Sequence, residues 1–383
     1  MKGFIIYSTW DEQNDKTIVQ LFGRLENGQS FCSINVHVPY FFVEKKSLEK
    51  AKSPNLKAQV QPSKLKTFHG EEIVKVSYTL QSDLTKIASY LHSKKVDTYE
   101  SDIKPHMQFL IDLDVKSTIN IEGSSSIGER VDRVYLEPTI KPSEFKPELK
   151  VLSIDIESDK NIDKLFCIGL HMQNYKNVFI ISDKKIKNAT SCKDELDCLQ
   201  KVKQEIIKLD PDIITGWNIA DFDFPFLRKI YEKHKLTFDI GRTNAETRMR
   251  ISSDFFRKST ITIEGRQVLD ALSMIKDPFI KEAPSVKYID INSWTLEDVS
   301  QAILGEGKLL VGKTRHEEIE KLYKNKEHQA LVDYNLQDCK LAYNLLEKTK
   351  TLDLAIERSE LTGLTFDKLT ASIAAFDSLY IRE

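Results

Sequence analysis

Short runs of apolar residues, broken by polar turns, fill the first hundred positions and are typical of β-strands. The clearest strand-like runs are 4–7, 18–22, 31–38 and 73–78. Asn27-Gly28 stands between two of these runs, and this dipeptide is a strong signal for a tight hairpin turn. Apolar residues then recur at helical spacing from Leu84 to Leu91, and a strand near Thr98 would complete a βαβ unit. We therefore expect a β-rich α+β domain in this part of the chain.

The apolar pattern stops between positions 136 and 150, where Pro138, Pro142 and Pro147 stand among charged residues. A stretch with several prolines and little periodicity is the best domain boundary in the sequence. The pattern that follows it is a different one, so we expect a separate domain on each side.

Strands and helices alternate beyond this boundary, which is the pattern of an α/β domain. The near-continuous apolar run 151–156 is typical of a strand that is buried on both faces. Further strands are expected at 165–171, 178–182 and 213–215, and helices from Ser191 and over 224–233, 294–304 and 330–348. Two more apolar runs, 261–263 and 267–269, flank Gly265 and predict a hairpin.

The composition narrows the class of protein but does not indicate an activity. With 383 residues, 40% of them hydrophobic, the chain is long enough for two or three domains. Its 56 Lys and Arg against 58 Asp and Glu give a net charge of -2, which on its own favours a protein with no anionic partner. Any contact with nucleic acid must therefore use a local basic surface. Five scattered cysteines without a Cys-x-x-Cys pair predict a reducing compartment and argue against structural zinc.

Asp155 and Glu157 form the first candidate site. They stand two apart in an apolar strand, so both side chains point to one face. Neighbouring carboxylates on a buried strand repel each other and lose hydration. A divalent cation such as Mg²⁺, which prefers carboxylate and phosphate oxygens, would offset that repulsion. Considered alone, however, the pair is better explained by a strand edge where both carboxylates reach water.

Further candidates lie where helices meet the predicted sheet. Asp223 stands between the strand 213–215 and a helix, a common place for sites in α/β folds, although Asp223 and Asp221 also suit helix caps. Tyr334 and Asp338 are four apart on a predicted helix and share a face, a spacing that core packing also explains. Neither feature identifies a site by itself.

Together these residues resemble the three motifs of the DEDD exonuclease superfamily, in the form with a tyrosine in its third motif. The motifs read Asp155-Ile156-Glu157, Asn218-Ile219-Ala220-Asp221-Phe222-Asp223 and Tyr334-Asn335-Leu336-Gln337-Asp338. The stretches that are similar to family B DNA polymerases, above all to their bacterial polymerase II branch, are 99–105, 212–218, 241–242, 265–270, 296–299 and 304–308. The resemblance spans nearly the whole chain and is strongest from 151 to 363.

The resemblance implies three parts of the chain. Residues 1–145 would form an N-terminal accessory domain, 146–356 a ribonuclease H-like exonuclease domain with a mixed sheet flanked by helices, and 357–383 a segment that returns to the first domain at the start of the polymerase region. Asp377-Ser378-Leu379-Tyr380 only imitates the end of the polymerase motif Asp-x-x-Ser-Leu-Tyr-Pro-Ser. We therefore expect an N-terminal fragment that lacks palm, fingers and thumb and does not polymerise DNA.

The resemblance also implies a reaction, the 3′→5′ proofreading hydrolysis of the terminal phosphodiester of single-stranded or frayed DNA with two Mg²⁺ or Mn²⁺ ions. Asp155 would bridge both ions. Glu157 and Asp338 would hold the ion that activates water, and Asp223 would hold the other. Tyr334 would orient the attacking water.

The implied partners are DNA, as a single-stranded 3′ end or a primer-template, and the remainder of the polymerase chain. Asn218, Phe222 and Phe224 beside the second motif are candidates for contacts with the strand, and core packing explains the two phenylalanines at least as well. We expect a monomer in the bacterial cytoplasm, at the nucleoid, with no signal peptide and no membrane span.

Two other functions fit the same residues. A standalone DEDD-type ribonuclease would use the same motifs, because they do not distinguish ribose from deoxyribose. A catalytically silent nucleic-acid-binding scaffold would keep the fold, although all five motif residues are intact.

Overall fold

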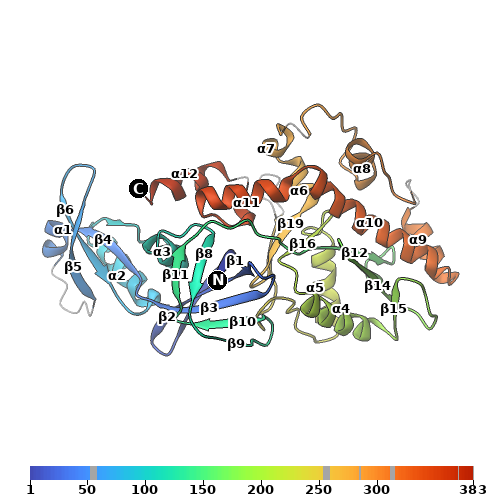
Figure 1. Cartoon of the computed structure of the whole chain (residues 1–383), viewed down its shortest axis with the longest axis horizontal. Helices are drawn as coiled ribbons and strands as arrows, with labels where there is room; N and C mark the ends of the chain where they lie inside the picture. The colour runs from blue at the N-terminus through green and yellow to red at the C-terminus, as the bar shows by residue number, and fades with distance from the viewer. Residues whose placement is uncertain (52–57, 253–258, 284–285, 311–314, 370, 383) are drawn as a thin grey trace. The chain divides into compact units, whose positions relative to one another are not determined.

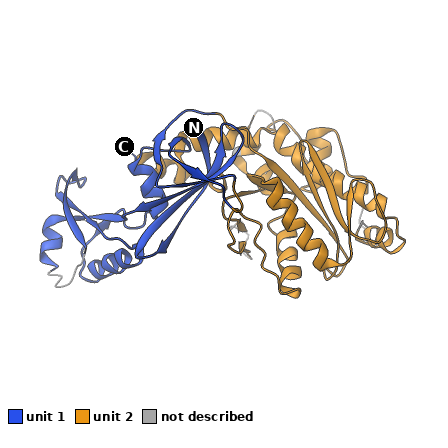
Figure 2. Cartoon of the chain, turned by 60° about the horizontal axis from the view of Figure 1, so that its bottom comes forward, with its two compact units in different colours: residues 1–128, 132–145, 382 blue, residues 129–131, 146–381, 383 orange. Residues whose placement is uncertain are grey.

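The structure of the chain is a computed structural model that describes residues 1–51, 58–252, 259–283, 286–310, 315–369 and 371–382. It divides into two compact units, which Figure 2 colours separately. The first comprises 1–128, 132–145 and 382, and the second comprises 129–131 and 146–381. The segment 357–381, which we expected on the N-terminal domain, clusters with the second unit. The division into three domains remains a prediction.

The first unit contains a seven-stranded sheet in the order β11-β8-β1-β2-β3-β10-β9. Its strands are β1 Lys2–Gln13, β2 Lys16–Leu25, β3 Ser30–His37, β8 Thr118–Glu122, β9 Ser125–Ser126, β10 Arg133–Leu136 and β11 Thr139–Pro142. The predicted hairpin joins β2 to β3, and Gly28 has the positive φ of 80° that its turn requires. Helix α3 (Pro105–Asp112) packs on the sheet, with Leu110 in one core with Val19 and Leu21.

The first unit also contains a four-stranded sheet in the order β5-β6-β4-β7. Its elements are β4 Tyr40–Glu44, α1 Lys45–Lys50, β5 Gln59–Lys66, β6 Glu72–Ser77, α2 Gln81–Ser93 and β7 Thr98–Tyr99. Strand β4 is antiparallel to both β6 and β7, so β6, α2 and β7 form a βαβ unit with β4 between its parallel strands. The apolar spacing of α2 buries Leu84, Ala88 and Leu91 in this core.

The second unit is built on a six-stranded mixed sheet in the order β15-β14-β13-β12-β16-β19 (Figure 1). Its strands are β12 Val151–Ser158, β13 Leu165–Met172, β14 Tyr175–Ile181, β15 Ala189–Cys192, β16 Ile213–Gly216 and β19 Gln267–Asp270. Strand β12 is antiparallel to β13 and parallel to β16, and β16 is parallel to β19. The predicted α/β class is confirmed.

Helices cover both faces of this sheet. The remaining elements are α4 Glu195–Leu209, α5 Asp223–Lys233, β17 Arg248–Arg250, β18 Thr260–Thr262, α6 Ala271–Lys276, α7 Pro278–Lys281, α8 Leu296–Leu304, α9 Arg315–Lys324, α10 His328–Lys348, α11 Thr351–Thr362, the 3-10 helix Phe366–Lys368 and α12 Ser372–Tyr380. Helix α4 packs on one face, with Leu199 against Leu152, and α10 covers the other, with Val332 in a core with Phe166. Within the described ranges, every helix is too short or too polar to cross a membrane.

Two local predictions are wrong. Ser191 does not begin a helix: it lies in β15, and Asp194 caps α4 instead. The hairpin predicted about Gly265 does not form, because β18 pairs with β17 whereas β19 joins the large sheet beside β16. Ile263 and Arg266 retain an isolated bridge at that turn. In both cases the local pattern indicated regular structure, and the tertiary partners decided which structure forms.

A buried ion network fixes the end of the sheet where β16 begins. Arg242 donates to Asp210 Oδ1 at 2.8 Å and to Asp212 Oδ1 at 2.6 Å, and Arg266 also donates to Asp210 Oδ1 at 2.8 Å. Asp212 in turn accepts from the backbone N–H of Lys150, just before β12, at 2.8 Å. Burial lowers the pKa of Arg242, but Asp212 and Asp210 raise it above its ordinary value, so the guanidinium stays charged. The network therefore ties β12 to β16.

Arg242→Met should lower the free energy of unfolding by about 3–5 kcal/mol, because it removes the guanidinium that pairs with the fully buried carboxylate of Asp212. Arg228 is the matched control, since it pairs with Glu232 on the surface of α5, with 43% and 62% of the two side chains exposed. Arg228→Met should cost about 0–1 kcal/mol. Urea denaturation followed by circular dichroism measures both. Equally small losses would show that the network does not hold the sheet.

Candidate active site

The alternation of β12 sends its carboxylates to the face of the sheet that α10 covers. Leu152, Ile154 and Ile156 pack in the core on the side of α4 and α5. Because successive side chains of a strand point to opposite faces, Asp155 and Glu157 lie on the side of α10, which contacts β12. The strand thus buries its apolar residues on one face and presents its acidic ones on the face that α10 covers.

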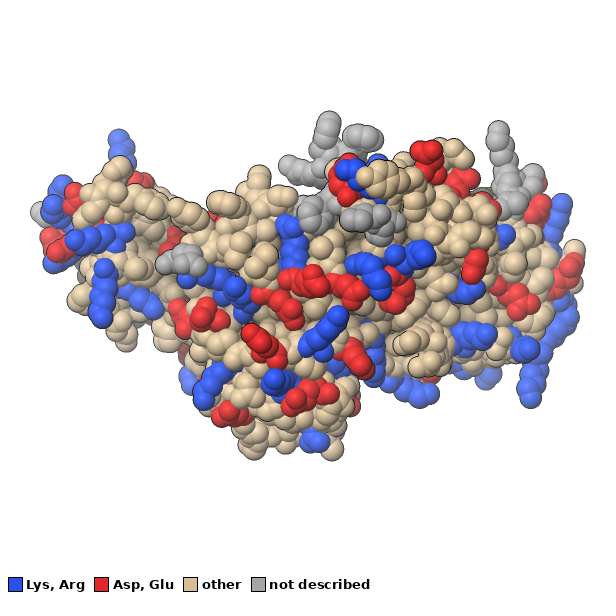
Figure 3. All heavy atoms as spheres, turned by 45° about the horizontal axis from the view of Figure 1, so that its top comes forward, with Lys and Arg blue, Asp and Glu red and all other residues tan. Residues whose placement is uncertain are grey.

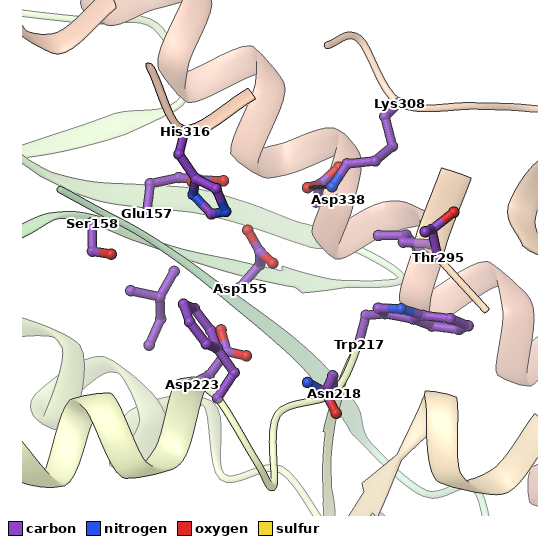
Figure 4. A pocket seen from close by; sticks show the side chains of 13 residues that line it. Asp155, Glu157, Ser158, Trp217, Asn218, Asp223, Thr295, Lys308, His316 and Asp338 are labelled. Atoms are coloured by element: carbon purple, nitrogen blue, oxygen red, sulfur yellow. Dashed lines mark ion pairs between the residues drawn. The ribbon is translucent and has the colours of Figure 1, made fainter. Parts of the chain in front are cut away.

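Helix α10 brings a third carboxylate to this pair. Asp338 is 2% exposed, and one oxygen from each of Asp155, Glu157 and Asp338 lies within 4.8 Å of the others. Figure 4 shows the three side chains converging from β12 and α10. We call these three residues the acidic group. It joins the first and third predicted motifs, which are far apart in the sequence.

Asp223 lies beside the acidic group and lines the same pocket, although it is outside the 4.8 Å cluster found among the described residues. It is the first residue of α5 and is 3% exposed. Burial raises the pKa of Asp223 well above its ordinary value, and the carboxylates of Asp155 and then Asp270 raise it further. The repulsion expected between Asp155 and Glu157 therefore also extends to Asp223.

A tight turn between β16 and α5 holds the second motif in place. Gly216 is required because a Cβ there would lie 2.4 Å from the carbonyl oxygen of Ile154. Asn218 has a left-handed backbone with φ of 61°, which asparagine tolerates better than most residues. The Asp270 carboxylate accepts the backbone N–H of Ala220 at 3.0 Å. These contacts fix a turn whose side chains line the pocket.

The pocket over the acidic group has a volume of about 300 Å³. Its lining beyond the carboxylates includes side chains from the β16–α5 turn, from the start of α8 and from α9, and these are Trp217, Asn218, Phe222, Thr295, Leu296 and His316. Figure 4 shows Trp217 and Asn218 on one side of Asp155 and His316 near Glu157. A ligand in this pocket therefore meets both carboxylates and aromatic side chains.

Lys308 is a residue of the site to which the sequence reasoning assigned no role. Its ammonium forms an ion pair with Asp338 and lies 5.1 Å from the centre of the Tyr334 ring. The two paired side chains are only 6% and 3% exposed. Glu297 holds this segment by accepting the backbone N–H of Lys308. The lysine follows Gly305-Glu306-Gly307 in a segment without periodicity, so no local pattern could have identified this contact.

The aromatic candidates divide between the core and the pocket. Tyr334 is 1% exposed and packs in the hydrophobic core between α10 and the sheet. Phe224 is 0% exposed and stacks on Phe238, with ring centres 5.8 Å apart, in the core of the opposite face. In the described part of the chain, Asn218 and Phe222 line the pocket, whereas Tyr334 and Phe224 are not among its lining residues.

The acidic group suits a divalent cation. Its donors are all carboxylate oxygens, which are the ligands that Mg²⁺ and Mn²⁺ prefer. Three close carboxylates carry more negative charge than the ammonium of Lys308 balances. A dication would offset the remaining repulsion.

Comparison with known proteins connects this geometry to a family. The family model described as DNA polymerase family B, exonuclease domain, matches residues 96–299, a range that contains Asp155, Glu157 and Asp223. DNA polymerase II of Escherichia coli (strain K12) is 28% identical over 99% of this chain and 48% of that protein. A DNA polymerase of Archaeoglobus fulgidus is 25% identical over 97% of this chain and 46% of that protein. The chain thus spans about half the length of these curated relatives.

A solved structure supports the fold. The family B DNA polymerase from the hyperthermophilic archaeon Pyrobaculum calidifontis matches 100% of this chain and 50% of its own, with a TM-score of 0.75 and 19% sequence identity. Together with the family match, this likeness confirms a ribonuclease H-like mixed sheet flanked by helices and an N-terminal β-rich domain.

Lys308→Met should lower the free energy of unfolding by about 3–5 kcal/mol at neutral pH, because the buried carboxylate of Asp338 then loses its ammonium partner beside two other carboxylates. Added Mn²⁺ should raise the melting temperature more in this variant than in the wild type, since the dication replaces the missing charge. Differential scanning calorimetry with and without Mn²⁺ measures both effects.

Lys340→Met is the matched control. Lys340 is on α10, like Asp338, and pairs with Glu306 with 42% and 48% of the two side chains exposed. It should change the free energy of unfolding by about 0–1 kcal/mol. Identical melting temperatures for the two variants would contradict the role that we assign to Lys308.

Proposed function

Because this chain belongs to family B of the DNA polymerases and carries their exonuclease domain, we propose that it removes mispaired nucleotides from the 3′ end of a DNA strand by hydrolysis. The observation that supports this reaction is the acidic group, with Asp223 beside it, in a single pocket. The carboxylates come from a strand, a turn and a helix that are distant in sequence. Core packing alone would not gather so many acids.

The proposed cofactors are two Mg²⁺ or Mn²⁺ ions. Asp155 would contact both ions, Glu157 and Asp338 would hold one of them, and Asp223 would hold the other. When bound, the ions supply the Lewis acidity that activates water and stabilises the leaving 3′ oxygen. Carboxylates perform poorly as nucleophiles at a phosphodiester, so their task here is to bind and to orient.

Two further side chains would act on these ligands or on water. The ammonium of Lys308 forms an ion pair with Asp338 and would hold this carboxylate in place. Tyr334 is proposed, from the third motif, to orient the attacking water by a hydrogen bond. Its ring is buried between α10 and the sheet, which restricts the positions that its hydroxyl can take.

The proposed substrate is a single-stranded or frayed 3′ end. A mismatched terminus unpairs at lower cost than a matched one, and this difference gives proofreading its selectivity. Phe222 and Trp217 line the pocket where an unpaired base would stack, and Asn218 offers a polar contact beside them.

Long-range attraction contributes little to DNA binding in this proposal. The net charge is -2, and Figure 3 shows acidic and basic side chains interspersed on the face that it draws. On a face of mixed charge such as this one, stacking and contacts to individual phosphates would hold the strand.

We infer the wider setting from the relatives, which are DNA polymerases about twice as long as this chain. The exonuclease would work beside a polymerase region of a longer polypeptide, as a monomer in the bacterial cytoplasm at the nucleoid. Residues 1–145 would form the accessory domain, 146–356 the exonuclease, and 357–383 the start of the polymerase region.

The chain should shorten a 5′-labelled single-stranded DNA from its 3′ end in Mg²⁺ or Mn²⁺ and not in EDTA. Asp155→Ala should lower kcat by a factor on the order of 10³ or more, because it removes charge that holds the cations at the reacting phosphate. Tyr334→Phe should cost less, about 10- to 100-fold. Asp163→Ala is the control, since Asp163 is 60% exposed and pairs with Lys229.

The same assay separates the other two functions. Faster cleavage of a matched RNA than of DNA would indicate a ribonuclease instead of a proofreading enzyme. Binding of single-stranded DNA without any metal-dependent loss of 3′ nucleotides would indicate a silent scaffold. Full activity of Asp155→Ala would contradict the proposed site.

A further inference from the structure

Asn335 reaches the acidic group from α10 and contacts Asp155 directly. Its Nδ2 donates a hydrogen bond to Asp155 Oδ2 at 2.7 Å, and the residue is 0% exposed. Neighbouring residues of α10, such as Leu331 and Val332, pack in the hydrophobic core. An amide buried in such surroundings is costly unless it is hydrogen-bonded, so the bond to Asp155 explains an asparagine at this position.

Gly169 provides the space for this contact. It stands directly opposite Asp155 in the pairing of β12 with β13. Its φ is not positive, so the backbone conformation does not require glycine. A Cβ at this position would lie 2.0 Å from Asn335 Oδ1 and 2.8 Å from Cys339 Sγ. A side chain at position 169 would therefore push Asn335 away from Asp155.

We propose that Asn335 and Gly169 form a positioning pair for Asp155, an inference that rests on the proposed function of the site. The amide holds one oxygen of the carboxylate and so restricts its rotation. A neutral donor orients Asp155 without adding a positive charge that would compete with a cation, unlike the ammonium of Lys308 at Asp338. Hydrogen-bond partners that orient ligands in this way tune metal affinity.

Asn335→Leu tests the proposal, because it keeps the size of the side chain and removes the donor. Its affinity for Mn²⁺, measured by isothermal titration calorimetry, should fall roughly 10- to 100-fold. Its kcat on single-stranded DNA should fall in the same range while KM for DNA changes little, since the DNA contacts remain. The melting temperature without metal identifies any loss that arises from poor folding.

Asn177→Leu is the matched control. Asn177 donates to Thr190 Oγ1 at 2.9 Å between two strands of the same sheet and is not among the residues that line the pocket in the described chain. Its removal also deletes an amide hydrogen bond, but Mn²⁺ affinity and kcat should stay at the wild-type values.

Gly169→Ala tests the contact between Asn335 and Asp155 by a change on strand β13. It should displace Asn335 and reproduce the loss of Mn²⁺ affinity. Asn335→Ala empties the space that the new methyl group enters, so Gly169→Ala should cause little further loss in that background. Additive losses in the double variant would contradict a shared role.

The remaining outcomes separate this inference from the proposed function. Wild-type Mn²⁺ affinity and kcat in a folded Asn335→Leu variant overturn the positioning role and leave the nuclease intact. A wild-type chain that neither binds Mn²⁺ nor cleaves DNA overturns both. If Asn335→Leu does not fold, Asn335→Ala, which adds no atoms, is judged by the same two measurements.

Discussion

The mutual repulsion of three close carboxylates, two of them buried and one half-buried, is the constraint that the centre of the second unit must satisfy. Strand β12 supplies Asp155 and Glu157, and α10 supplies Asp338, within a few ångströms of one another. The fold tolerates this arrangement because Lys308 pairs with Asp338 and Asn335 donates to Asp155. Such an acidic group weakens the folded state, so its presence indicates a function that needs concentrated negative charge.

The surrounding architecture holds that charge in a fixed geometry. Strand β16 is fixed at its start by the buried ion network through Asp212, and at its end by the close approach of Gly216 to Ile154. The turn that follows therefore begins from a rigid strand, and it places Asp223 beside the acidic group. Positioning of this kind matters because small displacements of catalytic groups cost large factors in rate.

The class of fold and the shared face of Asp155 and Glu157 were predictable because their signals are local, whereas the grouping of these residues with Asp338 followed only from the resemblance of the three motifs to a known superfamily. Alternation along β12 places Asp155 and Glu157 on one face without any tertiary information. The role of Lys308 was not predictable, because its contact with Asp338 depends on how α10 packs against a segment without periodicity. The same limit explains the error at Gly265, where both flanking strands exist but pair with other partners. Phe224 is a further example, because its place in the core depends on its packing against Phe238, which is distant in the local pattern.

The central claim is that the acidic group binds divalent cations. Anomalous diffraction from crystals soaked in Mn²⁺ tests it most directly, because it locates the ions without relying on activity. The account predicts a peak at about 2.1 Å from carboxylate oxygens of Asp155, Glu157 and Asp338. The absence of any peak there, at a Mn²⁺ concentration that supports DNA cleavage in solution, would contradict it.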